Sequence, residues 1–146
     1  MQITSKFTIA IHAIACIYYF EDSQTVTSAL ISGSTGANRV IVRNILGDLK
    51  NAGIINSSQG MSGISLLKKL NEISFYDIYT AIGGIGAKGL FNFHDNPNPK
   101  CDIGRNIHDA LDDRLMFIQN SFENSLKDIY MSEIIDQITE KLKKEH

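Results

Sequence analysis

Cysteine and proline are scarce in this sequence of 146 residues, and both scarcities narrow the class of protein. The two cysteines, Cys16 and Cys101, are too few for the disulfide framework of a small secreted protein, and they favour a reducing compartment. The two prolines, Pro97 and Pro99, lie close together, so no proline interrupts the helical pattern that follows them. At this length the chain is one domain, or one domain with an extension, and it has enough residues for a substantial core.

Long apolar runs are equally scarce. One run, from Phe7 to Phe20, follows the single cation Lys6, and the residues from Ala13 to Cys16 within it superficially resemble a lipoprotein cleavage box. His12 inside the run and three aromatic residues after the cysteine argue against an export signal. No other segment is long and apolar enough to span a membrane. We therefore expect a cytoplasmic protein.

The chain also has little net charge, a formal −2, which at first argues against a DNA-binding protein. The charges are divided unevenly along the sequence. The first 70 residues carry six basic and three acidic residues, a balance of about +3, and the remaining residues carry about −5. This division predicts a basic DNA-facing half and an acidic half elsewhere.

The segment from Thr27 to Leu66 has the pattern of a winged helix-turn-helix, which binds DNA. It contains a short helical stretch, 28–32, a breaker, 33–36, and a longer helix, 38–51, that begins with an asparagine cap. Gly53 ends the longer helix, and a glycine-punctuated hairpin follows directly. Together with the helices outside this segment, the pattern predicts a mainly α fold with a small β-hairpin wing.

Apolar residues recur in the longer helix at spacings of three and four, and this stripe is expected to face a core. Its members are Ile41, Val42, Ile45, Leu46 and Leu49. The opposite face carries polar residues of the types that recognise DNA bases, because arginine matches guanine and asparagine matches adenine. We predict that Arg39 and Arg43 read bases and that Asn38, Val40 and Asn44 supplement them. The alternative is that these are ordinary solvated positions.

The hairpin has two short strand-like runs, 54–58 and 64–67, on either side of a loop with two glycines. A hairpin directly after a recognition helix is a wing, and we expect its tip to approach the phosphate backbone or the minor groove of DNA through Gln59, Ser62 and backbone amides. The wing carries little charge, so its contribution to affinity should be modest. At the start of the chain, Thr4, Ser5 and Lys6 are expected to contact phosphates with the wing and so to fix the register on DNA.

Outside the helix-turn-helix, the apolar spacing predicts a buried scaffold helix over 4–20 and a helix over 74–82 with an acidic capping box from Ser74 and Asp77. Residues 90–100 form a loop with an aromatic anchor. A long helix runs from about Ile103 to Ile129, and Ser132 caps a final amphipathic segment that ends at Lys143. We expect a DNA-binding domain over 1–82, a loop and candidate sensor region over 83–102, and a dimerisation helix with a C-terminal helix over 103–146.

The long helix exceeds what a small winged domain needs for its own core. Its apolar seam is therefore expected to meet a second copy of the chain, because most helix-turn-helix proteins bind two half-sites as dimers. The seam consists of Ile107, Leu111, Leu115, Ile118, Phe122 and Leu126. The alternative is a helix that folds back on its own domain.

Four segments, 3–6, 46–53, 59–63 and 72–84, together resemble one family of bacterial regulators. The pattern looks like the Rrf-type (Rrf-two) family of winged-helix transcriptional regulators, and the likeness covers residues 1 to about 135. That family includes an iron-sulfur cluster regulator, a nitric-oxide-sensitive repressor and a cysteine-metabolism repressor. The resemblance implies a homodimer with a long dimerisation helix.

The cluster-binding members of that family place three cysteines in the loop before the long helix, whereas this chain has only Cys101 there. Thiolates hold an iron-sulfur cluster, and one cannot replace three. We therefore expect the branch without the iron-sulfur cysteines, and no iron-sulfur cluster. A zinc site from His94, Cys101 and His108 is not expected either, since a loop thiol and two surface histidines explain these residues. No cofactor is predicted.

Cys101 remains as a candidate redox or electrophile sensor, because Lys100 and Arg105 are close enough in sequence to stabilise its thiolate. It would pair with Cys16 or with its copy in a second subunit. Cys16 itself is better explained as a small core residue.

These patterns predict a sequence-specific DNA-binding transcriptional regulator, a homodimeric repressor that binds a palindromic operator on double-stranded DNA and responds to a thiol-based or small-molecule signal. The alternative is a winged-helix module that acts through a partner enzyme rather than DNA. An enzyme is not expected, because no nucleophile has a base and an orienting carboxylate at recognisable spacing.

Overall fold

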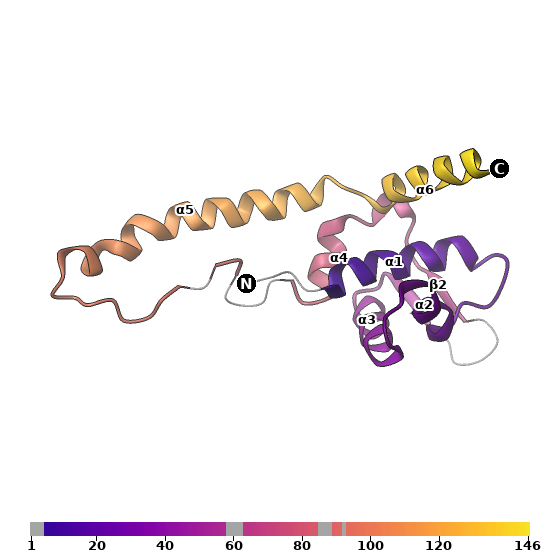
Figure 1. Cartoon of the computed structure of the whole chain (residues 1–146), viewed down its shortest axis with the longest axis horizontal. Coiled ribbons are helices and arrows are strands. Elements are labelled where there is room, and N and C mark those ends of the chain that lie inside the picture. The colour runs from indigo at the N-terminus through magenta and orange to yellow at the C-terminus, as the bar shows by residue number, and fades with distance from the viewer. Residues whose placement is uncertain (1–4, 58–62, 85–88, 92) are drawn as a thin grey trace.

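The computed structural model describes residues 5–57, 63–84, 89–91 and 93–146. The fold is mainly helical with a two-stranded antiparallel hairpin, so the predicted fold class is confirmed. Figure 1 shows a globular body from which one long helix projects. The elements in chain order are α1 (Ser5–Phe20), α2 (Ser28–Thr35), α3 (Arg39–Asn51), β1 (Ile55–Ser57), β2 (Ile64–Leu66), the 3-10 turn η1 (Leu70–Glu72), α4 (Phe75–Ala81), α5 (Asp102–Lys127) and α6 (Met131–Glu145).

The core of the body forms around α1, the predicted scaffold helix, which packs against α2, α3, α4 and α6. Its buried side chains meet aliphatic residues from each of these helices and from the hairpin. At one end, the rings of Phe7 and Phe75 pack edge to face with centroids 5.8 Å apart. The largest fully buried residues are Ile14, Ile17, Ile31, Ile45, Leu49, Ile54, Ile55, Ile73, Ile78 and Met131.

Helix α2 is longer than the sequence predicts. Thr27 caps its start, where the hydroxyl accepts a hydrogen bond from the Leu30 amide at 3.1 Å. The predicted breaker, 33–36, begins too early, because the helix continues through Gly33 to Thr35. It ends at Gly36, whose φ of 77° is the left-handed conformation that glycine adopts without steric cost.

Helix α3 has both of its predicted ends. The Asn38 side chain accepts a hydrogen bond from the Ile41 amide at 2.9 Å, and Gly53 has a left-handed φ of 77°. Behind Gly53, the amide of Ile54 reaches back to the Leu49 carbonyl at 3.0 Å, which closes a Schellman end. One member of the predicted apolar stripe is misplaced, since Ile41 is 38% exposed at the margin of the covered face.

The wing is a hairpin in which Ile55 pairs with Leu66 and Ser57 with Ile64. Its base is attached to the body at two points. The Ile64 amide donates to the Val26 carbonyl at 3.0 Å, and the Leu66 amide donates to the Glu21 carboxylate at 3.0 Å. The orientation of the wing relative to α3 is therefore set by the segment between α1 and α2.

Helix α4 begins with the predicted capping box. The Asp77 amide donates to the Ser74 hydroxyl at 3.1 Å, and the Ser74 amide donates to the Asp77 carboxylate at 3.0 Å. This helix holds the end of α5, where Tyr79 meets Phe122 edge to face at 6.0 Å and Lys127 lies over the Tyr76 ring at 4.7 Å. The rest of α5 extends away from the body (Figure 1).

Helix α6 returns to the body and packs on α1 and η1. The prediction that Ser132 caps this helix is wrong. The helix begins two residues earlier than predicted, with Tyr130 in the N-cap position, and the Tyr130 amide donates to the Glu133 carboxylate at 2.6 Å. Within the described parts of the chain, no helix has the length and apolar character needed to cross a membrane.

Candidate nucleic-acid interface

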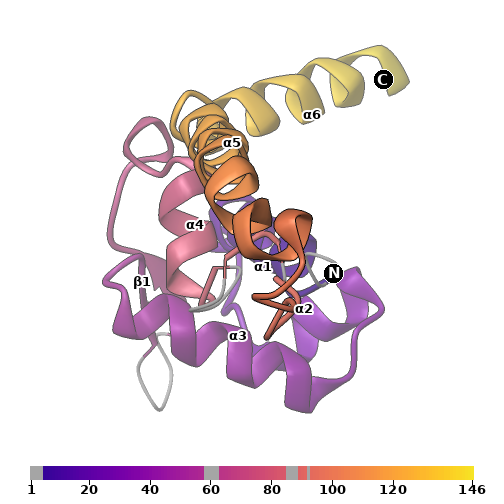
Figure 2. The ribbon, with the colours of Figure 1, turned by 90° about the vertical axis from the view of Figure 1, so that its left-hand side faces the viewer.

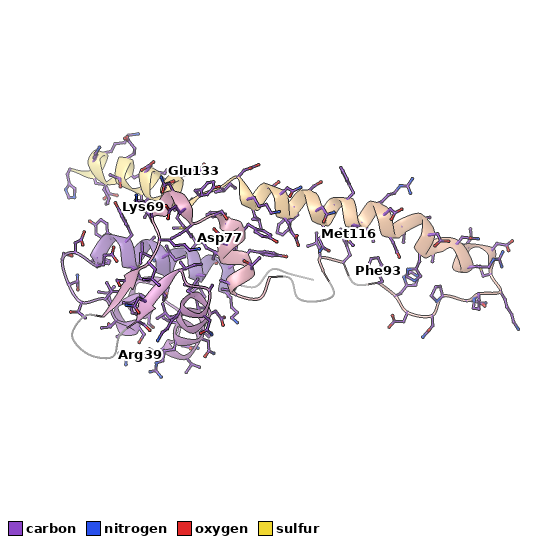
Figure 3. The ribbon with its side chains drawn as sticks, turned by 180° about the vertical axis from the view of Figure 1, so that it is seen from behind. Arg39, Lys69, Asp77, Phe93, Met116 and Glu133 are labelled. Carbon is purple, nitrogen blue, oxygen red and sulfur yellow. The ribbon has the colours of Figure 1, made fainter. Side chains whose placement is uncertain are left out.

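The outer face of α3 carries the residues predicted to read DNA bases. Arg39, Val40, Arg43 and Asn44 are all exposed, whereas Val42, Ile45, Leu46 and Leu49 are buried on the other face. Val40 is 63% exposed, an unusual position for a β-branched aliphatic side chain. Figure 3 shows Arg39 at the outer edge of the body, on the side away from α6. In Figure 2, α3 likewise lies along the face opposite α6, so neither α5 nor α6 covers it.

Asn38 already has a structural role at this helix. Its side-chain oxygen is used in capping α3, and its amide NH₂ group is free to donate to a base or phosphate. The cap bond occupies one lone pair of the Asn38 oxygen and fixes the orientation of the side chain, whereas Asn44 has no such commitment and is able both to donate and to accept.

A groove of about 530 Å³ separates α3 from the wing and the start of α2. Arg43 lies on one wall, and Thr25, Ser28 and Ser57 contribute hydroxyl groups from the other elements. Hydroxyls and the amides at a helix start are the groups that contact DNA phosphates. Sequence reasoning missed these residues. For Thr25 and Ser28, their position immediately before and within the first turn of α2 was the only signal available, and for Ser57 it was the position at the end of β1.

The other predicted phosphate contacts are described only in part. Thr4, Gln59 and Ser62 lie outside the described residues. Ser5 is exposed at the start of α1, and Lys6 lies 4.0 Å from the Asp48 carboxylate on α3. Lys50 is directed at the wing, where its ammonium donates to the Ser57 carbonyl at 3.3 Å.

Cys101 occupies the N-cap position of α5 and is exposed. The backbone amide of Gly104, and secondarily that of Ile103, lowers the pKa of the Cys101 thiol. The expected cause was different. The Arg105 guanidinium is engaged with the Asp102 carboxylate at 2.6 Å and the Pro99 carbonyl at 3.2 Å. The helix start, rather than Arg105, therefore stabilises the thiolate.

Cys16 is 5% exposed and lies in the core of the body. The start of α5 lies at the far end of the projecting helix, well away from α1 (Figure 1). A disulfide requires Cα atoms within about 7 Å, so Cys16 and Cys101 of one chain do not pair in this arrangement.

His94 and His108 stack with ring centroids 5.4 Å apart, and Phe93 packs on the same ring of His108 at 6.0 Å. His108 lies 3.4 Å from Asp112 on the next turn of α5. Across the described ranges, no three histidine, cysteine or acidic side chains come together in a way that would hold a metal ion. The loop before α5 is thus attached to the helix by ring contacts.

A model of the Rrf2 family, described as iron-dependent transcriptional regulators, matches residues 3–137. The chain belongs to the Rrf2 family. It is 34% identical to the HTH-type transcriptional regulator YwnA of Bacillus subtilis (strain 168). The alignment of 137 residues covers 94% of this chain and 99% of YwnA. The predicted family is therefore confirmed, and the chain is a DNA-binding transcriptional regulator and not an enzyme.

Solved structures of other proteins have the same fold. A crystal structure described as a DNA-binding protein superimposes with a TM-score of 0.71 at 30% identity, over 90% of this chain and 99% of that one. The oxidised form of CymR from Staphylococcus aureus superimposes with a TM-score of 0.69 at 18% identity, over 92% and 96% of the two chains. At that identity, the second likeness concerns the fold alone.

The iron in the family's description does not fit the cysteines of this Rrf2 chain. Clusters of iron and sulfur are held mainly by thiolates, with four protein ligands. The whole sequence has two cysteines, of which one lies in the core and the other at the start of α5. No thiolate-held cluster can be assembled from them within one chain.

Proposed function

We propose that this Rrf2 regulator is a cytoplasmic homodimeric repressor that binds a palindromic operator. The observation that supports operator reading most directly is the outer face of α3, on which Arg39, Arg43 and Asn44 are all exposed. In this proposal Arg39 and Arg43 contact base edges. Val40 and Asn44 add contacts beside them, and the groove around Ser28 holds a phosphate.

The dimer is proposed from the projecting part of α5. Large apolar side chains on this helix are uncovered in the single chain, with Ile103 and Phe117 each 72% exposed and Met116 55% exposed. Exposed apolar surface of this extent favours an interaction surface. A second copy related by a two-fold axis would cover it and would place two α3 helices on successive half-sites.

We further propose that residues 1–82 form the DNA-binding unit, that 83–102 sense a signal and that 103–146 carry the dimer contacts. Cys101 is a candidate sensor because its thiol is exposed and its pKa is lowered by the start of α5. Oxidant should weaken operator binding of the native protein and leave the Cys101→Ser variant unaffected. An equal oxidant response in the two proteins contradicts a sensor role for Cys101.

Fluorescence anisotropy tests the proposed function. The reduced protein is titrated into labelled DNA from upstream of its own gene and into scrambled DNA of the same composition, each at two salt concentrations. We expect tighter binding to the upstream DNA, with a salt slope on the order of 0.9 in log units per phosphate neutralised. Equal binding to both DNAs contradicts operator recognition.

A further inference from the structure

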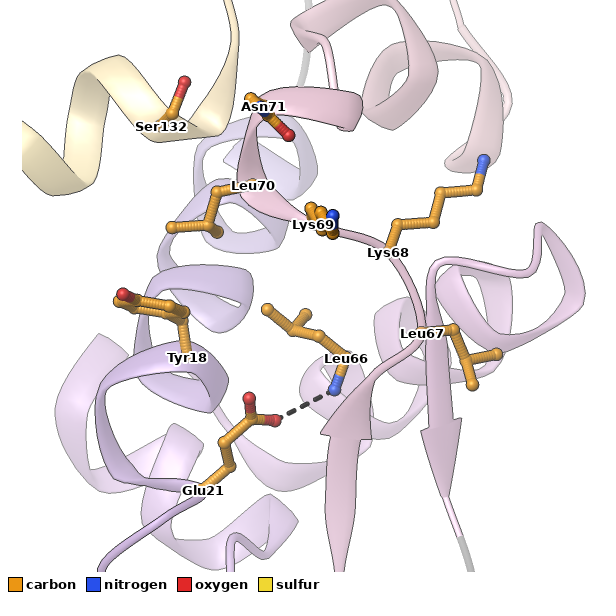
Figure 4. Close-up of a pocket in the computed structure, with 9 residues that line it drawn as sticks. All are labelled: Tyr18, Glu21, Leu66, Leu67, Lys68, Lys69, Leu70, Asn71 and Ser132. Atoms are coloured by element: carbon orange, nitrogen blue, oxygen red, sulfur yellow. Dashed lines mark hydrogen bonds between the residues drawn. The ribbon is translucent and has the colours of Figure 1, made fainter.

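A second hollow of the molecule has a volume of about 570 Å³, which lies within the range of small-molecule sites. It opens between the end of α1, the segment that leaves β2, the turn η1 and the start of α6 (Figure 4). In Figure 3, Lys69 marks its position near α6, whereas Arg39 lies on the opposite edge of the body. DNA bound to α3 therefore leaves this pocket open to solvent.

One end of the pocket carries a carboxylate. One oxygen of Glu21 accepts a hydrogen bond from the Leu66 amide at 3.0 Å, and Figure 4 shows the other oxygen directed into the space between Tyr18 and Leu66. Among the described residues, this second oxygen has no hydrogen-bond or ion-pair partner. Because Glu21 is half-buried, its free oxygen is an acceptor suited to an ammonium group.

The opposite end of the pocket carries donors. Lys69, Asn71 and Ser132 lie together there, and Ser132 belongs to the first turn of α6, which favours negative charge (Figure 4). Within the described ranges, the Lys69 ammonium makes no ion pair, and neither the amide nor the hydroxyl of Ser132 makes a hydrogen bond. Free ammonium, amide and hydroxyl donors are suited to a carboxylate.

Apolar side chains hold these two ends apart. Leu66, Leu70 and the ring of Tyr18 lie between Glu21 and the donors. A ligand that meets both ends therefore carries its ammonium and its carboxylate at opposite ends of an apolar body. A free α-amino acid does not do so, because its two charged groups lie only about 3 Å apart on one carbon.

The chain between the two ends limits the length of the ligand. Leu66, whose amide binds the Glu21 carboxylate, and Lys69 are three residues apart, and three extended residues span at most about 11 Å. In an extended dipeptide the ammonium and the carboxylate lie about 6 Å apart, and a hydrogen bond at each end adds about 3 Å. A dipeptide thus has the length that the two ends require.

The middle of the pocket suits the rest of a dipeptide. The apolar wall covers two apolar side chains, and its burial of them favours binding. The amides of Lys68 and Lys69 line the same segment and make no hydrogen bond in the described part of the chain, so they are free to donate to the ligand's peptide carbonyl. We propose that this pocket binds a dipeptide with apolar side chains, with its ammonium at Glu21 and its carboxylate at Lys69.

The pocket is also connected to the wing. Leu66 is the last residue of β2 and pairs with Ile55, so the Glu21 carboxylate bonds directly to the base of the hairpin. An ammonium group at Glu21 shares this carboxylate with the Leu66 amide and so changes the attachment of the wing. The bound dipeptide is then an effector of DNA binding. This regulatory half rests on the proposed function, whereas the binding of the dipeptide does not.

Isothermal titration calorimetry of the full chain without DNA tests the site. The probes are L-leucyl-L-leucine and L-phenylalanyl-L-leucine, each compared with its N-acetyl form, which lacks the ammonium, and its C-terminal amide, which lacks the carboxylate. We expect at least one free dipeptide to bind with a dissociation constant of about 1 mM or below. Both capped forms should bind about tenfold more weakly or worse, because each loses a charge-assisted hydrogen bond.

Two further probes test the geometry of the ligand. Free L-leucine has both charges but on one carbon, so it should bind about tenfold more weakly than the dipeptide or worse. The linear compound ε-aminocaproate has its charges at opposite ends but has neither side chains nor a peptide bond. It should also bind about tenfold more weakly or worse, because it leaves the apolar wall and the two free amides without partners.

Two variants assign the ends of the pocket. Glu21→Gln keeps an oxygen for the Leu66 amide but removes the charge, so it should lose the preference for the free dipeptide over the N-acetyl form. Lys69→Ala should lose most of the preference over the C-terminal amide. Lys143→Ala, on an exposed part of α6 away from the pocket, is the matched control and should bind as the native chain does. If Glu21→Gln unfolds, the exposed Lys69→Ala variant still tests the site.

No binding of either dipeptide up to about 10 mM, equal binding of the capped forms, equal binding of L-leucine or ε-aminocaproate, or unchanged preferences in Lys69→Ala would each overturn the site. Operator anisotropy with and without the bound dipeptide tests the regulatory half, for which we expect a change in affinity of about fivefold or more. Calorimetric binding with unchanged operator affinity overturns that half alone. Absence of operator binding in the dipeptide-free protein overturns the proposed function and leaves the calorimetric result standing.

Discussion

At the scale of single residues, the pKa of the Cys101 thiol depends on the position of this residue at the start of α5. The amides of Gly104 and Ile103 lower its pKa, because the start of α5 favours the charged thiolate. A pKa that is lower in the folded than in the unfolded chain stabilises the fold at high pH. This contribution is present above the unfolded pKa and is lost as the pH falls through the folded value.

Alkylation by iodoacetamide measures this effect, because only the thiolate reacts. We expect the rate at Cys101 to reach half of its maximum at a pH below about 8.5, the ordinary value for cysteine. In urea, the midpoint should return to that ordinary value. Cys16, buried in the core, should react only after unfolding, so the Cys101→Ser variant is the control for the folded protein. Identical midpoints for the folded and unfolded chains contradict a role for the start of α5.

Substitutions of Arg43 and Lys6 should distinguish the reading of bases from contact with the DNA backbone. Arg43 lies on the outer face of α3, whereas Lys6 lies at the start of α1, 4.0 Å from Asp48. We expect Arg43→Ala to lose about 1–3 kcal/mol of operator affinity and to relax sequence preference, since a bidentate contact to guanine is lost. Lys6→Ala should weaken binding to all sequences alike and reduce the salt slope by about 1. Equal effects of the two changes on operator and scrambled DNA contradict this division.

At the scale of elements, prediction from the sequence succeeded where the local pattern and the tertiary contacts agree. The ends of α3 follow from Asn38 and Gly53, whose side chain and φ angle act within one turn of the helix. Prediction from the local pattern failed where packing against the rest of the molecule determines the structure. Gly33 does not break α2, because a helix tolerates an interior glycine at a cost of about 1 kcal/mol. The groove between α3, the wing and the start of α2 was missed because the residues that line it come from four separate segments.

The base of the wing offers a test of the contact between the hairpin and the segment before α2. Gly63 has a φ of 68°, and a Cβ atom there would lie 2.8 Å from the Thr25 methyl and 2.9 Å from the Val26 carbonyl. We expect Gly63→Ala to destabilise the fold by about 1–3 kcal/mol, through both the strained φ and the contact with the backbone. Urea denaturation measures the change.

Gly47→Ala is the matched control. Gly47 lies within α3, has no positive φ, and its added methyl would meet nothing within 4 Å. It should leave stability unchanged or raise it by up to about 1 kcal/mol, because alanine favours the helix. A Gly63→Ala protein as stable as the Gly47→Ala protein contradicts the attachment of the wing at Val26.

At the scale of the whole molecule, α5 divides into two parts. Near its end, Phe122 and Leu126 are covered by α4, which is the folded-back arrangement that the sequence left as an alternative. Further out, the loop before α5 covers one side of the helix through Leu90 on Gln119 and Phe93 on His108. The predicted apolar seam is therefore partly used within the chain. A repeat of apolar residues does not reveal this, because it does not specify which surface covers them.

The uncovered residues, Phe117 above all, are then the ones that a second copy must bury. A charge at this position would be desolvated in both subunits of a two-fold dimer, so the loss counts twice. We expect Phe117→Asp to weaken dimerisation by roughly 1,000-fold, from about 2 kcal/mol in each subunit. Light scattering should then give the mass of one chain at concentrations where the native protein has the mass of two.

Asn120→Asp adds the same charge on an exposed position of α5 and should remain dimeric. Operator affinity should fall with the dimer, because one α3 helix reaches only one half-site. A Phe117→Asp protein that keeps the mass of two chains would place the dimer contacts elsewhere on the molecule.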